Sequence, residues 1–286
     1  MRKNSAKIQI IRKPRDLQKI SKKMLMQGKS IGLVPTMGAL HKGHISLIKK
    51  SAKSNEVTIV SIFVNPTQFG ANEDFAKYPR RLQVDAKLCA EAGASIVFAP
   101  EPKDMYPAPL QTFAHNPCLE TLYCGACRPG HFSGVLSVVA KLFNISMPSK
   151  AYFGEKDFQQ LFLIRKMAFD LNFPIKVIGV KTIREHNGLA MSSRNEYMSL
   201  KEREAASSIY AGLLEAKNMH KKGIYSVAKL KEAVKKKIKS AGGKIQYVEV
   251  ASKSDLQPVK AKAAKGDVIL LACFFGKTRL IDHAEL

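Results

Sequence analysis

The sequence predicts an α/β fold: a Rossmann-like doubly wound parallel sheet with a smaller C-terminal α+β domain. In the first 180 residues, short and almost continuously apolar runs alternate with helical patterns, as in IGLVP at 31–35. Apolar runs of this kind suit parallel strands that are covered on both faces and joined by crossover helices. After about residue 182 the pattern changes to Lys-rich helices followed by two or three strands.

The elements follow from these patterns in chain order. Strands are expected at 31–35, 57–65, 94–100, 150–154 and 175–180, with helices between them at 44–54, 82–93, 134–145 and 157–172. The C-terminal part is expected to hold helices near 201–222 and 226–240 and strands near 244–252, 267–275 and 277–282. Two domains are therefore predicted, 1–181 and 182–286, and the smaller one is expected to pack over the strand ends, where doubly wound sheets bind ligands.

The composition narrows the class of protein. No apolar stretch approaches the ~20 residues that cross a bilayer. Five cysteines, with no secretory or transit segment in the N-terminal MRKNSAKIQIIRK, predict a soluble protein of the reducing cytoplasm. The 47 Lys and Arg against 23 Asp and Glu give a net charge of +24, which attracts any polyanion. Because the lysines are spread over helical faces and Trp is absent, neither a specific nucleic acid nor a membrane is expected as a partner.

The first polar segment, TMGALHKGH at 36–44, directly follows a predicted strand. Gly38 allows a sharp turn, and Gly43 begins the next helix without a side chain that would block a ligand. Free N–H groups at a helix start favour an anion. His41 and His44 would point to the same side and, as imidazolium donors, stabilise charge that develops on a phosphate. A helix-capping loop with incidental histidines explains the segment equally well.

Two more polar segments follow predicted strands. FVNPTQFG at 63–70 exposes Gln68, whose amide can bind hydroxyls and carboxylates, although a plain turn at Asn65-Pro66 also fits this segment. FGEKDFQQL at 153–161 places Lys156 at a helix start. Since a cation at a helix start opposes the helix dipole, Lys156 is better explained as a residue that faces a phosphate.

The fourth segment, MSSRN at 191–195, supplies two hydroxyls and an arginine that can grip a triphosphate or pyrophosphate, although a flexible Ser-rich loop remains an alternative. The four segments together predict a nucleotide site at the strand ends. The sequence contains neither GxxxxGK[ST] nor GxGxxG, which disfavours kinase-type and dinucleotide sites.

Taken in order and spacing, several motifs resemble those of the pantothenate synthetases (pantoate–β-alanine ligases), of the HIGH-type nucleotidyltransferase superfamily. They are PTMGALHKGH, FVNPTQFG, YPR at 78–80, RPGHF at 128–132, FGEKDFQQL, GLAMSSRN and GKTRLID, which together span essentially the whole chain. The resemblance implies that (R)-pantoate attacks the α-phosphate of ATP to give pantoyl adenylate and pyrophosphate, and that β-alanine then displaces AMP to give pantothenate. It also implies Mg²⁺ with the ATP, a nucleotide- and pantoate-binding first domain, a C-terminal lid domain and a homodimer.

Matching positions assigns the family's roles to residues of this chain. The catalytic group would be His41, His44, Lys156 and Arg194. The ATP site would comprise Met37, Gly38, Ala39, Leu40, His41, Lys42, Gly43, His44, Gly154, Glu155, Lys156, Asp157, Ile183, Met191, Ser192, Ser193 and Arg194. The substrate-binding residues would be Gln68, Gln160 and Arg128. The family role of His44 is that of proton donor, but we expect the histidine pair to stabilise the pentacoordinate phosphate instead.

The chain departs from the family pattern just before RPGHF. Cys118, Cys124, Cys127 and His131 form C-x5-C-x2-C-x3-H, which could be a zinc site or, through its CxxC, a redox site. Small buried cysteines are the favoured interpretation. Nothing explains Ser133, where relatives often carry Arg.

Two alternative functions remain open. One is a nucleotidyltransferase that keeps the nucleotide on its product, against which FVNPTQFG and FGEKDFQQ argue together. The other is a nucleic-acid-binding protein driven by the +24 charge, which would bind RNA or DNA with a steep salt dependence.

Overall fold

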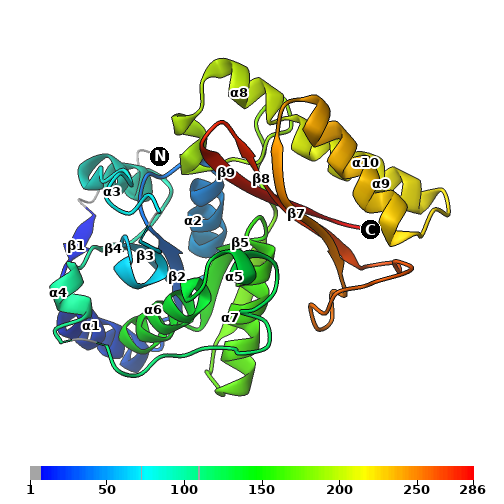
Figure 1. Cartoon of the computed structure of the whole chain (residues 1–286). Coiled ribbons are helices and arrows are strands. Elements are labelled where there is room, and N and C mark those ends of the chain that lie inside the picture. The colour runs from blue at the N-terminus through cyan, green and yellow to red at the C-terminus, as the bar shows by residue number, and fades with distance from the viewer. Residues whose placement is uncertain (1–7, 72, 109) are drawn as a thin grey trace. The chain divides into compact units, whose positions relative to one another are not determined.

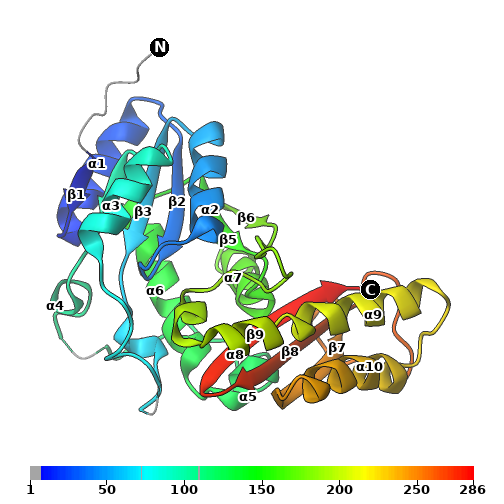
Figure 2. The ribbon, with the colours of Figure 1, turned by 90° about the horizontal axis from the view of Figure 1, so that it is seen from above.

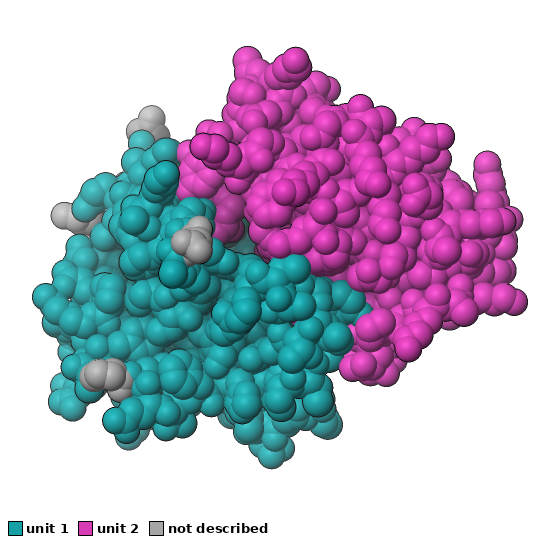
Figure 3. Space-filling model, in the orientation of Figure 1, with its two compact units in different colours: residues 1–155, 160–180 teal, residues 156–159, 181–286 magenta. Residues whose placement is uncertain are grey.

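The computed structural model describes residues 8–71, 73–108 and 110–286, which form two compact units (Figure 3). Unit 1 contains the chain up to residue 155 and residues 160–180, and unit 2 contains residues 156–159 and 181–286. The chain thus passes between the units after residues 155, 159 and 180. Residues 1–7, which begin the stretch where no targeting segment is expected, lie outside the described residues.

In the described part of the chain, unit 1 is built on a six-stranded parallel sheet with the order β1-β4-β3-β2-β5-β6 (Figure 1). The strands are β1 (Gln9–Ile11), β2 (Ile31–Thr36), β3 (Val57–Ile62), β4 (Ile96–Phe98), β5 (Lys150–Gly154) and β6 (Lys176–Val180). The apolar runs of β2, β3 and β4 are almost wholly buried, as strands covered on both faces require. The predicted doubly wound parallel sheet is confirmed.

Helices cover both faces of this sheet. The helices of this part of the chain are α1 (Pro14–Met26), α2 (Lys42–Ser54), α3 (Leu82–Glu91), α4 (Pro102–Met105), α5 (Tyr123–Cys127), α6 (His131–Ser146) and α7 (Phe158–Asp170), with a 3-10 turn η1 (Pro66–Gln68). Helices α1 and α6 pack together on one face and α2 and α3 on the other (Figure 1, Figure 2). The sequence did not predict β1, α1, α4 or α5. Elements as short as β1, α4 and α5 offer too few residues for a periodicity to emerge.

The direction of the chain through the sheet reverses between β2 and β5. From β2 the chain proceeds through β3 to β4, and from β5 it proceeds the other way to β6. Thr36 pairs with Ile62, and Leu33 pairs with Ala151, so the carboxyl ends of β2, β3 and β5 lie at one edge. Doubly wound sheets bind ligands at such a switch point. The segments that follow β2, β3 and β5 are therefore the first place to look for a site.

Unit 2 is the smaller α+β unit that the sequence predicts. Its described residues form an antiparallel sheet with the order β7-β8-β9, and the helices α9 and α10 pack against each other and against this sheet. The elements are a 3-10 helix η2 (Ser193–Tyr197), α8 (Leu200–Ala205), α9 (Ser208–Lys221), α10 (Val227–Ser240), β7 (Lys244–Ala251), β8 (Val268–Phe275) and β9 (Thr278–Glu285). Within residues 8–71, 73–108 and 110–286, no helix has the length and apolar character of a membrane span.

The single helix expected near 201–222 is wrong, because α8 and α9 are separate. The Ser207 hydroxyl donates to the carbonyl oxygen of Glu204 at 2.6 Å, and its backbone N–H donates to the same oxygen at 3.1 Å. A serine that competes in this way for a carbonyl interrupts the regular helical hydrogen bonds.

Candidate active site

The backbone turns sharply between β2 and α2. Gly38 (φ 86°) and Ala39 (φ 50°) both have left-handed conformations. A Cβ atom at Gly38 would lie 3.0 Å from Oδ2 of Asp85, so the turn has little room for a side chain. The Thr36 hydroxyl accepts from the N–H of Gly38 at 3.2 Å and donates to the carbonyl oxygen of Ser61 at 2.7 Å. The turn is thereby fixed to the neighbouring strand β3.

A buried carboxylate holds the same turn from the other side. Asp85 on α3 is 2% exposed; its Oδ2 accepts from the N–H of Ala39 at 3.0 Å and its Oδ1 from the N–H of Leu40 at 2.9 Å. Sequence reasoning missed this residue. A signal was present, because Asp85 shares the buried face of α3 with Ala86 and Cys89, where an acidic residue is out of place.

The two histidines cap α2 and lie against each other. Nδ1 of His41 accepts from the N–H of Gly43 at 3.1 Å, and Nδ1 of His44 accepts from the N–H of His41 at 3.4 Å. Their ring centroids are 4.0 Å apart. Since an accepting Nδ1 carries no proton, each ring is neutral with its proton on Nε2. Each ring therefore has Nε2 as its donor nitrogen, and the capping and phosphate-binding interpretations of the segment are compatible.

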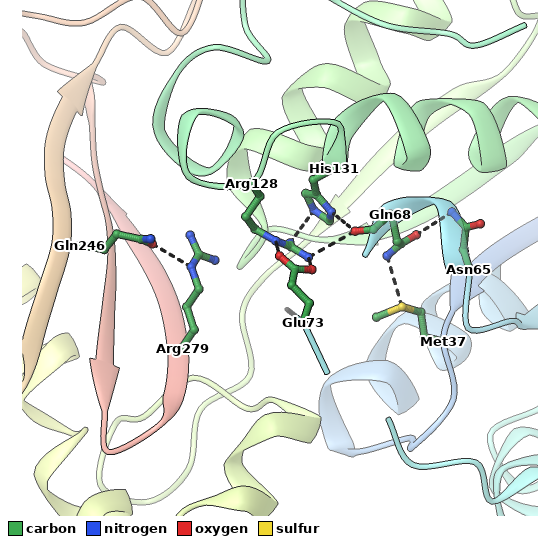
Figure 4. Close-up of polar contacts among 8 residues, drawn as sticks. All are labelled: Met37, Asn65, Gln68, Glu73, Arg128, His131, Gln246 and Arg279. Carbon is green, nitrogen blue, oxygen red and sulfur yellow. Dashed lines mark hydrogen bonds and ion pairs between the residues drawn. The ribbon is translucent and has the colours of Figure 1, made fainter. Parts of the chain in front are cut away.

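Gln68 lies beside the histidine-bearing turn (Figure 4). Its Nε2 donates to Sδ of Met37 at 3.2 Å, and its Oε1 accepts from Nδ2 of Asn65 at 3.1 Å. Asn65 is 1% exposed and also contacts the hydroxyl of Tyr106 and the carbonyl oxygen of Gly134, at 2.8 Å and 3.2 Å. Asn65 thus fixes the turn that carries Gln68. Its position shortly after a buried strand and directly before a proline is the signal that could have identified it.

Arg128 is bound to the same turn through a network that the sequence did not predict (Figure 4). Its Nε donates to Oε1 of Glu73 at 2.6 Å and its Nη2 to Oε2 at 2.5 Å. Nη1 of Arg128 lies 2.7 Å from Nε2 of His131, whose Nδ1 lies 2.8 Å from the carbonyl oxygen of Gln68. Because a guanidinium only donates, Nε2 must accept, so Nδ1 of His131 carries the proton and donates to Gln68.

The charge of Glu73 matches this arrangement. Burial raises the pKa of Glu73, but the hydrogen bond and the charge of Arg128 outweigh it and hold the pKa below its ordinary value of 4.5. Glu73 is therefore ionised at neutral pH, and it occupies the fork of the guanidinium. Arg128 is in this way tied to the Gln68 turn.

The segment after β5 contains residues of both units. Gly154 ends β5 beside the end of β2, and no atom within 4 Å would meet a Cβ at this position. Glu155 follows in unit 1, and Lys156 and Asp157, which belong to unit 2, directly precede α7. Gln160 lies in the first turn of α7 and is half-buried. The structure thus places Gly154 at the same edge of the sheet as the turn after β2.

In unit 2 the structure brings together Ile183 and the MSSR segment. The backbone N–H of Met191 donates to the carbonyl oxygen of Ile183 at 2.9 Å. The Ser192 hydroxyl then caps η2 by accepting from the N–H of Arg194 at 3.3 Å. These predicted ATP-binding residues lie on one continuous loop of unit 2, which also contains Ser193, a buried residue that is 8% exposed.

A buried network supports that loop. Asn195 is 3% exposed, and its Nδ2 donates to Oε1 of Glu185 at 2.7 Å. Arg203 donates to both oxygens of Glu185 at 2.8 Å. Burial raises the pKa of Glu185, but the hydrogen bonds from Arg203 and Asn195 and the positive charge of Arg203 outweigh burial, so the net pKa lies below 4.5. Sequence reasoning missed Glu185 and Arg203.

The cysteines before RPGHF do not gather around a metal position. Across the described ranges, no group of three or more His, Cys, Asp and Glu side chains is arranged to hold a metal ion. The interpretation of these cysteines as small buried residues is right for Cys124 but wrong for Cys118 and Cys127, which are exposed. Both ring nitrogens of His131 contact other protein groups. The zinc alternative therefore has no support in the structure.

Known proteins resemble this chain over nearly its whole length. The family model for pantoate-beta-alanine ligase matches residues 9–285. The chain is 49% identical over 280 residues to the pantothenate synthetase of Sulfurihydrogenibium sp. (strain YO3AOP1). The matched region covers 97% of this chain and 100% of that protein. It is 50% identical over 258 residues to the pantothenate synthetase of Clostridium novyi (strain NT), covering 90% and 91%.

Solved structures also resemble this chain over nearly its whole length. The pantothenate synthetase of Thermus thermophilus has a TM-score of 0.91 at 39% identity, over 97% of this chain and 99% of that one. The pantoate-beta-alanine ligase of Francisella tularensis, solved with beta-gamma ATP and β-alanine, has a TM-score of 0.82 at 38% identity, over 97% of each chain. The fold class and the resemblance that the sequence predicts are both confirmed.

Proposed function

Because this chain belongs to the pantoate-beta-alanine ligase family, we propose that it condenses (R)-pantoate with β-alanine to give pantothenate, at the expense of ATP. The relative from Francisella tularensis, solved with an ATP analogue and β-alanine, supports the choice of substrates. The observation that carries the proposal is the contact between Gln68 and Met37, which joins the expected pantoate residue to the histidine-bearing turn at the strand ends. An acid-binding group and a phosphate-binding turn side by side suit the adenylation of a carboxylate.

The first step forms pantoyl adenylate. The carboxylate of pantoate attacks the α-phosphorus of ATP, the bond to the bridging oxygen breaks, and pyrophosphate leaves. Negative charge grows on the α-phosphate oxygens in the pentacoordinate transition state, where hydrogen-bond donors are most effective. His41 and His44 would supply their Nε2–H groups as donors, and the start of α2 would add backbone N–H groups.

The pyrophosphate end would be held by residues of unit 2. Lys156 and Arg194 supply positive charge, and Ser192 and Ser193 supply hydroxyls, which is the chemistry that grips a leaving pyrophosphate. Gly154, Glu155, Asp157, Ile183 and Met191 would complete the nucleotide site. We propose residues 1–181 as the nucleotide- and pantoate-binding domain and residues 182–286 as a lid domain.

Pantoate would be bound by Gln68 and Gln160. A side-chain amide offers a donor and an acceptor together, which suits a hydroxy acid. The contacts of Gln68 with Met37 and Asn65 orient its amide before substrate binds. We propose that Arg128 acts on pantoate through this turn, because its guanidinium is occupied by Glu73.

The second step releases AMP. The amine of β-alanine attacks the acyl carbon of pantoyl adenylate and loses a proton, the bond from that carbon to the phosphate oxygen breaks, and AMP leaves. Mg²⁺ would accompany ATP and neutralise part of the phosphate charge. Such an ion binds chiefly through phosphate oxygens and water, which suits a described chain with no clustered metal ligands. We further propose a homodimer that works in the cytoplasm without a specific nucleic acid or a membrane as partner.

One assay tests the reaction. Pyrophosphate should appear with ATP and pantoate alone, and AMP only after β-alanine is added. A nucleotidyltransferase that keeps the nucleotide on its product would release no AMP, and a nucleic-acid-binding protein would consume no ATP. Neither result is compatible with the proposal.

The role of the histidines is tested by His44→Ala. Loss of one transition-state donor should lower pantoate-dependent pyrophosphate release about 100- to 1,000-fold. Lys49→Ala, on the exposed face of the same helix, serves as the matched control and should keep the wild-type rate. A full rate of pyrophosphate release in His44→Ala would show that the assigned role is wrong.

A further inference from the structure

Asp85 is buried in an unusual way. Asp282 is the other acidic residue of the described chain that is buried to this degree, at 3% exposure. It lies against the guanidinium of Arg184. Asp85, at 2% exposure, instead directs both carboxylate oxygens to main-chain N–H groups. Burying a carboxylate is costly unless strong hydrogen bonds replace its water. A small apolar residue would pack with Ala86 and Cys89 without that cost, so stability of α3 does not explain the carboxylate.

The two N–H groups that Asp85 binds belong to the most constrained part of the turn after β2. Ala39 has a left-handed conformation (φ 50°) although it carries a Cβ, and it follows Gly38, which is also left-handed. Such conformations persist only where the surroundings fix them. Asp85 supplies that constraint from α3, because hydrogen bonds to a charged acceptor are about twice as strong as neutral ones.

The constraint leads directly to the catalytic histidines. Leu40, whose N–H donates to Asp85, precedes His41 in the chain. The N–H of His41 donates to Nδ1 of His44, and the ring of His41 accepts from Gly43. Each link is one peptide unit or one hydrogen bond, so a rotation of the turn moves both imidazoles.

We propose that Asp85 is a positioning residue for the adenylation step: it fixes the backbone at Ala39 and Leu40 and thereby aims the Nε2–H groups of His41 and His44 at the α-phosphate. This inference rests on the proposed function. Asp85 is 2% exposed and each of its oxygens accepts an N–H of the turn, so it would act on the substrates through the turn. The effect falls mainly on the first step, because only that step passes through a pentacoordinate phosphorus, whereas in the second step the bonds change at the acyl carbon and the phosphate oxygen takes up the electron pair of the breaking bond.

The test separates the two half-reactions in one protein preparation. In Asp85→Asn the side chain keeps its size and one accepting oxygen, but its amide group faces one of the two N–H donors. Pantoate-dependent exchange of pyrophosphate into ATP measures the first step, and pantothenate formed from supplied pantoyl adenylate and β-alanine measures the second. We expect the exchange rate to fall about 100-fold, as for a reacting group displaced by about 1 Å, with the second rate little changed.

Two further variants keep the test decisive. Cys89→Ala changes a side chain one turn along the same buried face of α3 and removes neither hydrogen bond from the turn to Asp85, so its ratio of first- to second-step rate should equal that of the wild type. Gly38→Ala strains the same turn from within, because its Cβ would lie 3.0 Å from Oδ2 of Asp85 at a φ of 86°. It should reproduce the selective loss of the first step if Asp85→Asn does not fold.

Amide hydrogen exchange adds a measurement that needs no reaction. In Asp85→Asn without ligand, exchange at Ala39 and Leu40 should become faster than in the wild type. Unchanged exchange there, or half-reactions that fall in proportion, or a Cys89→Ala ratio as low as that of Asp85→Asn, overturns the positioning role. Absence of any exchange of pyrophosphate in the wild type would instead overturn the proposed function, while the hydrogen-exchange result still decides whether Asp85 holds the turn.

Discussion

Gly134 on α6 lies against the turn that carries Gln68, and we predict that Gly134→Ala damages pantoate binding in a folded protein. A Cβ at this position would lie 2.2 Å from the carbonyl oxygen of Thr67 and 2.8 Å from Cα of Gln68. The carbonyl oxygen of Gly134 also accepts from Nδ2 of Asn65, so the helix and the turn are already joined. Backbone atoms cannot rotate out of the way, so either the turn or the helix has to move.

The size of the effect follows from these distances. Ordinary contacts of a Cβ begin at 3.4 Å, which means that the 2.2 Å approach has to open by about 1 Å. Overpacking of a tight contact costs about 1–3 kcal/mol of stability. A displacement of about 1 Å in a substrate-positioning group costs about 100-fold in rate. We therefore expect kcat/KM for pantoate to fall about 100-fold, or about 2.7 kcal/mol of transition-state stabilisation.

Steady-state kinetics with pantoate varied at saturating ATP measure this effect, and thermal unfolding measures the loss of stability. Ala140→Gly on the same helix is the matched control, because it destabilises the helix by about 1 kcal/mol without reaching the turn. A folded Gly134→Ala protein with the wild-type kcat/KM for pantoate would refute the reasoning. So would an Ala140→Gly protein that shows the same loss.

Three other predictions concern charge, burial and reactivity. The folded-state pKa of Glu73 lies below 4.5, so the stability that ionised Glu73 contributes is present above pH 4.5 and is lost as the pH falls through the folded-state pKa. Glu73→Gln should therefore reduce the loss of unfolding free energy at acid pH. An unchanged loss would contradict the ion pair with Arg128. Asn195→Ala removes one hydrogen-bond donor from the buried carboxylate of Glu185, so thermal unfolding should show a loss of about 1–3 kcal/mol in stability and ATP should bind more weakly. Wild-type values for both would show that Asn195 does not support the loop. Burial raises the pKa of the Cys89 thiol to about 12. Alkylation of the native protein near pH 8, mapped by mass spectrometry, should therefore label the exposed Cys118 and Cys127 well before Cys89. Equal labelling would contradict the buried position of Cys89.

The sequence predicted most of the larger elements, because their signals are local, although it missed the 13-residue helix α1. The runs at β2, β3 and β5 are almost continuously apolar, which indicates strands buried on both faces and hence a parallel sheet. The short β1, α4 and α5 escaped prediction because so few residues carry no period. The break between α8 and α9 escaped because it depends on the rotamer of one serine, Ser207, and not on hydrophobicity.

The charge state of the histidines illustrates the limit at the site. Their spacing predicted that both would face one side, and the structure brings their rings to 4.0 Å. The spacing could not show that each Nδ1 accepts a main-chain N–H, because this depends on the turn preceding α2. Only the structure indicates that Nε2 is the donor nitrogen of each ring.

By itself the sequence determined which chemical groups stand at the ends of strands and the starts of helices, since glycine, histidine and amide residues act on the backbone within a few positions. Only the tertiary structure decided which distant residues hold those groups in place. Asp85 binds Leu40 across 45 residues of chain, Arg128 binds Glu73 across 55, and Gln68 meets Met37 across 31. A hydrogen bond requires atoms about 3 Å apart, and no periodicity in the chain marks which partners the packing of α3, η1 and α6 will bring within that distance.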